Sequence, residues 1–313
     1  MSQNNNLTYT RMIPLSIAVM LVLSLLVSVP KASAAAPYTT YGGCVKYIGP
    51  IFSKRSVGSI RQKYIDPLVA GRIKTIDALN KRVATLSPDQ VAVLSAGLNN
   101  DKQTILNIQA QSKTVTDVRV LRDNYCQMIY KTQINQFRGP QVSNLQKLDR
   151  RLVVDTKLFN ALSKQAGSGR FQAVIDQKIA SAKDSITANI NQENSLIPAT
   201  VNATASFDGV NAGNNLPQVS KATFDQLNQN FKTAYAIYNE IIVLKIAGKG
   251  FNPNKSLTLV SVNMTKNGQP VANASDANKA IVRIKVGGGK TYERTIARKD
   301  KNFVWHVQST KPL

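Results

Sequence analysis

Apolar side chains recur at every third or fourth position from about residue 56 to residue 249. This spacing places them on one face of an α-helix, which turns once every ~3.6 residues. Breaks at Gly139-Pro140, at Gly167-Ser168-Gly169 and at Pro198 divide the pattern into about six helices. Because the early connections are short, we expect neighbouring helices to run antiparallel in an up-down bundle.

Three local signals refine the helix boundaries. Pro67 is expected to break or kink the first helix, because proline has no N–H to donate. Ser87-Pro88-Asp89-Gln90 predicts a capping box, in which the Ser87 and Gln90 side chains bond to backbone N–H groups of the first turn. Residues 199–217 are rich in Asn, Ala, Gly and Thr, which predicts a long loop before the last helix.

The pattern changes to strict alternation after Gly250. Val282, Ile284 and Val286 alternate with basic residues, and turn residues at Asn267-Gly268 and Gly287-Gly288-Gly289 separate the runs. This predicts an antiparallel meander of about four strands over residues 251–313, with Trp305 in its core. A module of this size is marginal alone, so we expect it to pack on the helices or on a partner. The predicted fold is therefore mainly α: a helical bundle over residues 56–250, then a segregated β module.

The N-terminus carries the features of an export signal. Arg11 precedes an apolar run from Ile13 to Val29, and Ala32-Ser33-Ala34 provides small residues for cleavage. We expect residues 1–34 to be a signal peptide, followed by an N-terminal arm over residues 35–55. The apolar run also reaches the lower limit of a membrane-spanning helix, so an uncleaved anchor is the alternative. Either way, the protein is expected outside the cytoplasm: extracellular, on the cell surface or in a periplasm-like space.

The sequence contains two cysteines, Cys44 and Cys126. In an exported chain, two cysteines favour a disulfide, which would fasten the N-terminal arm to the helical body. The alternative is two unpaired thiols, with Cys126 a small core residue.

Basic residues outnumber acidic ones, with 40 Lys and Arg against 17 Asp and Glu and a formal net charge of +23. The β module alone carries 11 basic and 3 acidic residues. Such a concentration attracts anionic polymers such as nucleic acid or envelope polysaccharide, and also lipid head groups. The alternative is a solvated surface without a dedicated ligand. The candidate anion-binding residues cluster around two adjoining hairpins: Arg283, Lys285, Lys290, Arg294, Arg298, Lys299 and Lys301.

The residues needed for common catalytic and metal chemistry are scarce. His306 is the sole histidine, and a Cys/His zinc site needs about four ligands. No G-x-S-x-G motif, phosphate loop, calcium loop or carboxylate pair at a glycosidase spacing stands out. We therefore predict no catalytic, cofactor-binding or metal-binding residues and no small-molecule substrate.

The helical part resembles a group of exported helical-bundle proteins from candidate-phyla bacteria of the Patescibacteria type. The resemblance covers about residues 57–195, implies a helical exported protein, and carries no catalytic residues over. The β module lies outside it. The resemblance rests on these short segments: Arg72-Ile73-Lys74, Ile76 to Asn80, Leu86 to Gln90, Thr116-Asp117-Val118, Leu121-Arg122, Pro140-Gln141-Val142, Asp149-Arg150, Phe171-Gln172 and Ala182-Lys183-Asp184.

Three functions remain in order of preference. The first is a non-enzymatic structural or interaction protein of the cell envelope or surface, in which the helices are a scaffold and the basic β module makes contacts. The second is a binding protein for an anionic polymer, either DNA or wall polysaccharide. The third is an enzyme of unrecognised type, whose site would assemble from residues distant in sequence.

Overall fold

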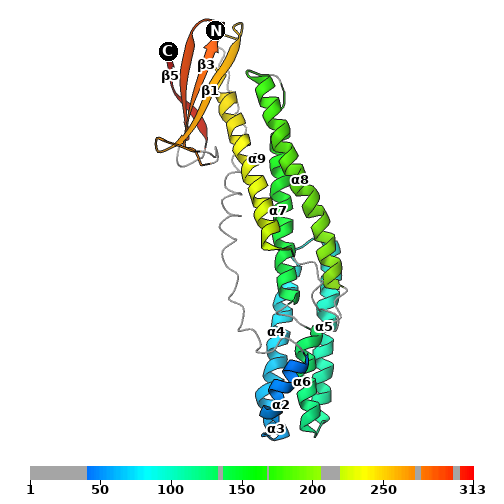
Figure 1. The fold of residues 1–313 in the computed structure, drawn as a ribbon. Helices are drawn as coiled ribbons and strands as arrows, with labels where there is room; N and C mark the ends of the chain where they lie inside the picture. Colours follow the sequence, from blue (N-terminus) through cyan, green and yellow to red (C-terminus); the bar gives the residue numbers. More distant parts are fainter. Residues whose placement is uncertain (1–40, 133–136, 168, 206–218, 272–275, 299–303) are drawn as a thin grey trace, which may run out of the picture. The chain divides into compact units, whose positions relative to one another are not determined.

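The computed structural model describes residues 41–132, 137–167, 169–205, 219–271, 276–298 and 304–313 (Figure 1). The predicted signal peptide lies outside these residues. Among the described residues, helices come first, up to Ala247, and a five-stranded antiparallel sheet follows, which confirms the predicted mainly α fold with a segregated β module. The described chain divides into two compact units. We call residues 41–151 with 193–220 the N-terminal unit, and residues 152–192 with 221–313 the C-terminal unit.

The N-terminal unit is helical. Its core is built from fully buried apolar side chains, among them Ile76, Leu98, Ile105, Leu121 and Leu145, which are the positions of the three-four pattern. Its elements are α2 (Tyr41–Phe52), α3 (Val57–Ile60), the π-helical turn η1 (Arg61–Ile65), α4 (Asp66–Val83), α5 (Pro88–Thr114), α6 (Val118–Thr132), the first part of α7 (Gly139–Ser163) and the last part of α8 (Gln172–Ala205).

The predicted N-terminal arm contains helix α2, and its cysteine is paired as expected. Cys44 forms a disulfide with Cys126 of α6, across a Cα–Cα distance of 5.9 Å. Both cysteines are completely buried. Beside them, the ring of Phe52 meets Tyr64 and Tyr125 edge to face. Because these contacts bury one side of α2, this segment is part of the N-terminal core.

Tertiary packing modifies the helix boundaries that the local sequence predicts at Pro67, Ser87 and Pro198. The π-helical turn η1 ends just before Pro67, so the expected irregularity is present without a break in the helical backbone. Ser87 is the N-cap of α5, but its side chain makes no capping bond. Gln90 instead donates from Nε2 to Asp149 Oδ1 over 3.2 Å. The predicted helix end at Pro198 is wrong, since α8 continues to Ala205 while its apolar positions Ile197 and Val201 are buried.

The C-terminal unit combines the ends of α7 and α8 with helix α9 (Lys221–Ala247) and the sheet. The strands are β1 (Leu257–Lys266), β2 (Gln269–Pro270), β3 (Lys279–Val286), β4 (Thr291–Arg298) and β5 (Trp305–Pro312). Their order is β2-β1-β3-β4-β5. The predicted meander is therefore present, with the two-residue β2 added at the Asn267-Gly268 turn.

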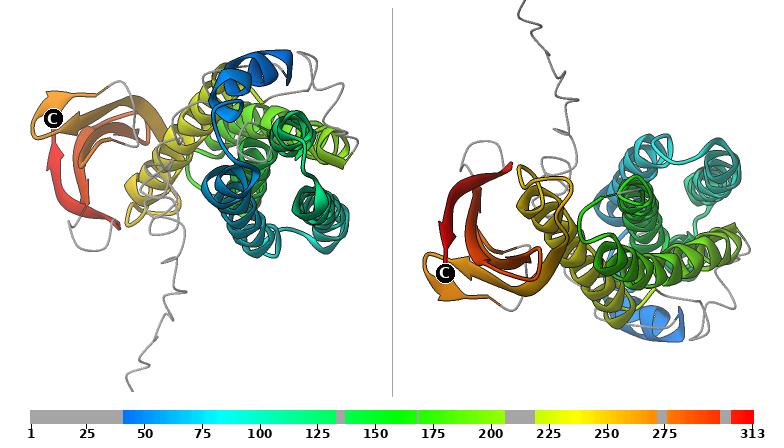
Figure 2. Two further views of the ribbon diagram at one scale, coloured as in Figure 1. Left: turned by 90° about the horizontal axis from the view of Figure 1, so that it is seen from below. Right: turned by 90° about the horizontal axis from the view of Figure 1, so that it is seen from above.

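One face of the sheet packs against α9, and the sheet curves beside this helix (Figure 2). Val282, Ile284 and Ile296 are completely buried there, together with Ala234, Ile241 and Leu244 of α9. Trp305 is 5% exposed and belongs to the same cluster, as predicted. Burial on this face leaves the opposite face of the sheet to carry the polar residues. In the part of the chain that the structure describes, no helix is long and apolar enough to cross a bilayer.

Candidate anion-binding face of the sheet

Strand β3 presents basic side chains on the outside of the sheet. Because side chains alternate along a strand, burial of Val282 and Ile284 sends Arg283 and Lys285 to the opposite face. Both are exposed, and so is Lys290, which follows the Gly287–Gly289 turn. Gly287 and Gly288 have φ angles of 60° and 73°, the left-handed region that glycine adopts without strain. This tight turn brings Lys285 and Lys290 to one end of the sheet.

An acidic residue lies in the middle of this outer face. Arg283 donates from Nε to Glu293 Oε2 across β3 and β4, over 3.1 Å. Glu293 is in turn opposite Lys311 of β5 in the strand register. Two bases therefore flank one acid across β3, β4 and β5. The net charge of the three residues is positive, but Glu293 offsets the charge of Arg283. Lys311 was not among the predicted residues, and its pairing with Glu293 places it on the outer face.

Arg294 lies on the inner face of the sheet and fastens β4 to the end of α9. It is 7% exposed, and its Nη1 donates to the carbonyl oxygen of Ala247 over 2.8 Å and also to that of Lys249. Its guanidinium lies 4.0 Å from the ring centroid of Phe251. Burial lowers the pKa of Arg294. Since carbonyl groups at a helix C-terminus carry partial negative charge, this contact satisfies the helix end.

Arg298 has a similar position at the other end of β4. Its Nη2 donates to Asn239 Oδ1 of α9, and its guanidinium lies 4.5 Å from the ring centroid of Trp305. Burial is the main cause that lowers the pKa of Arg298, and it is opposed by Tyr235 and Asp276. Arg294 and Arg298 are thus not on the outer face with Arg283, Lys285 and Lys290. Lys299 and Lys301 lie outside the described residues.

Lys255 joins the basic end of the sheet, although the sequence pattern did not single it out. Its side chain runs along the glycine turn, with Cδ 3.5 Å from where a Cβ on Gly287 would lie. Arg170 supports this segment by donating to the carbonyl oxygens of Asn252 and Lys255. Among the described residues, no acidic side chain forms an ion pair with Lys255, Lys285 or Lys290. The candidate site therefore centres on these three lysines, with Arg283 and Lys311 beside them.

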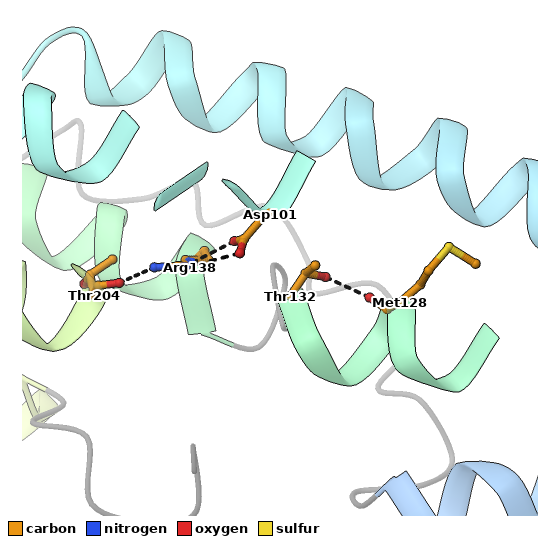
Figure 3. A network of polar contacts seen from close by, with 5 residues as sticks. All are labelled: Asp101, Met128, Thr132, Arg138 and Thr204. Atoms are coloured by element: carbon orange, nitrogen blue, oxygen red, sulfur yellow. Dashed lines mark hydrogen bonds and ion pairs between the residues drawn. The ribbon is translucent and has the colours of Figure 1, made fainter. Parts of the chain in front are cut away.

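The N-terminal unit contains a buried polar network of a different kind (Figure 3). Arg138 is 2% exposed and donates to both carboxylate oxygens of Asp101, over 2.8 Å and 3.2 Å, and also to the carbonyl of Thr204. Burial raises the pKa of Asp101, while the bonds from Arg138 oppose that change. This network joins α5, α8 and the residues before α7, and it leaves neither buried charge without a partner.

Among the described residues, no group of three or more His, Cys, Asp and Glu side chains could hold a metal ion. His306 is half-buried on β5 opposite Ala297. Comparisons with protein-family models, with curated proteins and with solved structures found no match.

Proposed function

We propose that the protein is an exported, non-enzymatic interaction protein of the cell envelope or surface, with the helices as scaffold and the outer face of the sheet as contact surface. One observation carries this proposal: the sheet uses its inner face for packing and exposes Arg283, Lys285 and Lys290 on or beside the outer one. Clustered bases repel one another, so their concentration on one face contributes nothing to folding. An anionic partner would offset that repulsion.

Export is the second part of the proposal. It is supported by Arg11, the apolar run Ile13 to Val29 and the small residues after it, all outside the described residues. The Cys44–Cys126 disulfide is consistent with an oxidising compartment. We expect mass spectrometry of protein recovered outside the cytoplasm to find an N-terminus near Ala35 or Pro37. Intact chain beginning at Met1 in the membrane fraction would instead support the uncleaved anchor.

Binding of an anionic polymer is the more specific candidate function, and the exposure of the three lysines around the glycine turn favours it. The test is retention of the full chain on immobilised DNA and on isolated envelope polymer across a series of salt concentrations. Replacing Arg283, Lys285 and Lys290 with Gln should weaken binding and flatten the dependence on salt, by about one unit of log–log slope for each lost contact.

A matched control removes the same charge elsewhere. Lys74, Lys81 and Lys113 are exposed on α4 and α5 of the N-terminal unit. Replacing all three with Gln should leave the slope near that of the natural chain. If the two triple variants lose affinity equally, binding depends on net charge alone and the sheet has no special role.

A further inference from the structure

The two edges of the sheet differ in how well they can accept another strand. Among the described strands, β5 forms one edge and pairs with β4 alone. Strand β1 is close to the other edge, because β2 pairs with it only at Thr265 and Lys266. Among the described strands, none pairs with the outer side of β1 from Leu257 to Val262. Open edges of this kind add strands from other chains unless something blocks them.

The β5 edge ends in a proline. The N–H of Leu313 donates to the carbonyl of Thr291 over 2.9 Å, so Leu313 directs its backbone toward β4. Because the direction alternates along a strand, Pro312 and Thr310 direct their backbone polar groups away from β4. Pro312 has no N–H to offer an incoming strand, and a register shift beside Ile296 disturbs the edge further.

The β1 edge is open. The carbonyl of Met264 accepts from Val271 on the outer side, so Val262 directs its backbone the same way. The carbonyl of Ser256 accepts from Gly287 on the side toward β3. Leu257 and Leu259 therefore direct their backbone N–H and C=O groups away from β3. No proline interrupts this stretch, which contains one register shift against β3, between Leu259 and Ser261.

The side chains along the β1 edge are apolar and incompletely covered. Leu257, Leu259 and Val262 face the core but are only half-buried, and α9 packs mainly on β3, β4 and β5. A strand added beside β1 would bury the remaining apolar area if it placed apolar residues on the same face. Its other residues would lie on the outer face, beside basic side chains.

The charge around this edge selects the chemistry of those other residues. Lys285 is opposite Thr258 in the register, and Arg283 is opposite Ser261. Lys255 and Lys266 are exposed at the two ends of β1. Acidic side chains on an incoming strand would therefore be attracted most near Lys255, Lys285 and Lys266, because Arg283 is already paired with Glu293. A second copy of this chain would bring the same bases to the contact, so like-charge repulsion disfavours pairing of two β1 edges.

We infer that the outer edge of β1 binds an extended segment of a partner protein in which apolar and acidic residues alternate. Main-chain hydrogen bonds to Leu257, Leu259 and Val262 supply the pairing, and the basic outer face selects acidic side chains. This interaction uses the edge of the sheet and does not depend on polymer binding by its face.

The probe is a short synthetic peptide in which Val alternates with Glu, titrated against the full chain. Two N-methylated forms provide the decisive comparison, one methylated on its Val residues and one on its Glu residues. Charge and side chains are the same in both, but only one set of N–H groups points toward β1. We expect one methylated form to bind about tenfold more weakly or worse, and the other to bind like the parent. Loss with methylated Val indicates antiparallel pairing, and loss with methylated Glu indicates parallel pairing.

Variants of the protein test the same edge. Val262→Pro removes an outward N–H, and it should weaken the parent peptide about tenfold. Thr310→Pro makes the matched change on β5 and should not alter binding. Val262→Pro should also leave retention on DNA unchanged, which separates this inference from polymer binding.

Equal binding of both methylated peptides would overturn the inference, because it would mean attraction by charge alone. A peptide in which Val alternates with Lys binding as well as the Glu form would also overturn it. So would sedimentation showing self-association that Val262→Pro abolishes while no peptide binds, since the edge would then serve a second copy.

Discussion

At some positions of this molecule, a close contact between two chain segments determines which residue type fits. Gly248, just after α9, is the sharpest case. A Cβ added at Gly248 would lie 2.6 Å from Cβ of Arg170, an atom near the backbone that cannot easily move away. Arg170 is itself held by its bonds to the carbonyls of Asn252 and Lys255. Glycine is therefore required here for the close approach of two chain segments.

We predict that Gly248→Ala destabilises the protein by about 1–3 kcal/mol, because the added methyl group overpacks this contact. Gly71→Ala is the control. Gly71 lies inside α4 with nothing within 4 Å of an added Cβ, so alanine should stabilise it by about 0.5–1 kcal/mol. Chemical denaturation of both variants gives the comparison. Equal effects of the same sign would show that the Arg170 contact has no consequence.

The Arg138–Asp101 pair supports a second prediction at this scale. Asp101→Ala should destabilise the folded state by about 3–5 kcal/mol, since Arg138 would stay buried without its carboxylate partner. Replacing both residues with apolar ones, Asp101→Leu with Arg138→Met, should recover most of that loss. A double variant as unstable as the single one would mean that the pair itself, and not the avoidance of a lone buried charge, provides the stability.

At the scale of elements, arginines of β4 tie the sheet to α9. Arg294 satisfies carbonyl groups at the C-terminus of the helix, and Arg298 reaches Asn239 two turns earlier. Both contacts bring together parts of the chain that are far apart in sequence. The sheet is small, so these ties and the apolar core beneath them provide the support that a module of its size requires.

Arg294→Met should therefore destabilise the sheet by about 2 kcal/mol, because the helix-end carbonyls lose a charged donor while the apolar stem is retained. Hydrogen exchange should show the loss first in the amides of β4 and β5. Lys285→Met on the outer face serves as the control and should change stability by less than about 0.5 kcal/mol. Unchanged exchange in the Arg294 variant would contradict the tie.

Much of the element pattern follows from the sequence, whereas the roles of single residues often do not. The alternation of Val282 and Ile284 with Arg283 and Lys285 fixed both faces of β3 correctly. The same rule, applied from Ile296, would have placed Arg294 and Arg298 on the inner face, but their charge suggested solvent. Partners distant in sequence decided the rest. Gln90 bonds to Asp149 and not to the helix cap, and α8 continues through Pro198 with Ile197 and Val201 buried on either side of it.

At the scale of the whole molecule, the disulfide and the single tryptophan report on different units. Cys44 and Cys126 are in the N-terminal unit, 82 residues apart in sequence, and Trp305 is in the C-terminal unit. Loss of the crosslink should cost about 4 kcal/mol in the chain-entropy model. Two optical probes can therefore separate the unfolding of the two units.

We predict that replacing both cysteines with serine moves the unfolding transition seen by circular dichroism to lower denaturant. The midpoint of the transition seen by Trp305 fluorescence should shift less. The reason is that the crosslink restricts only the unfolded chain of the N-terminal unit. Coincident shifts of both signals would show that the two units unfold as one cooperative body.

The placement of this crosslink also determines how the protein survives digestion. Lys54 and Arg55 are exposed in the turn after α2, where a trypsin-like protease can cut. The severed piece would still be attached to α6 through Cys44–Cys126, and its buried side chains would remain in place. A nick there would leave a single particle until a reductant reaches the sulfurs, so cleavage and loss of the protein would become two separate events.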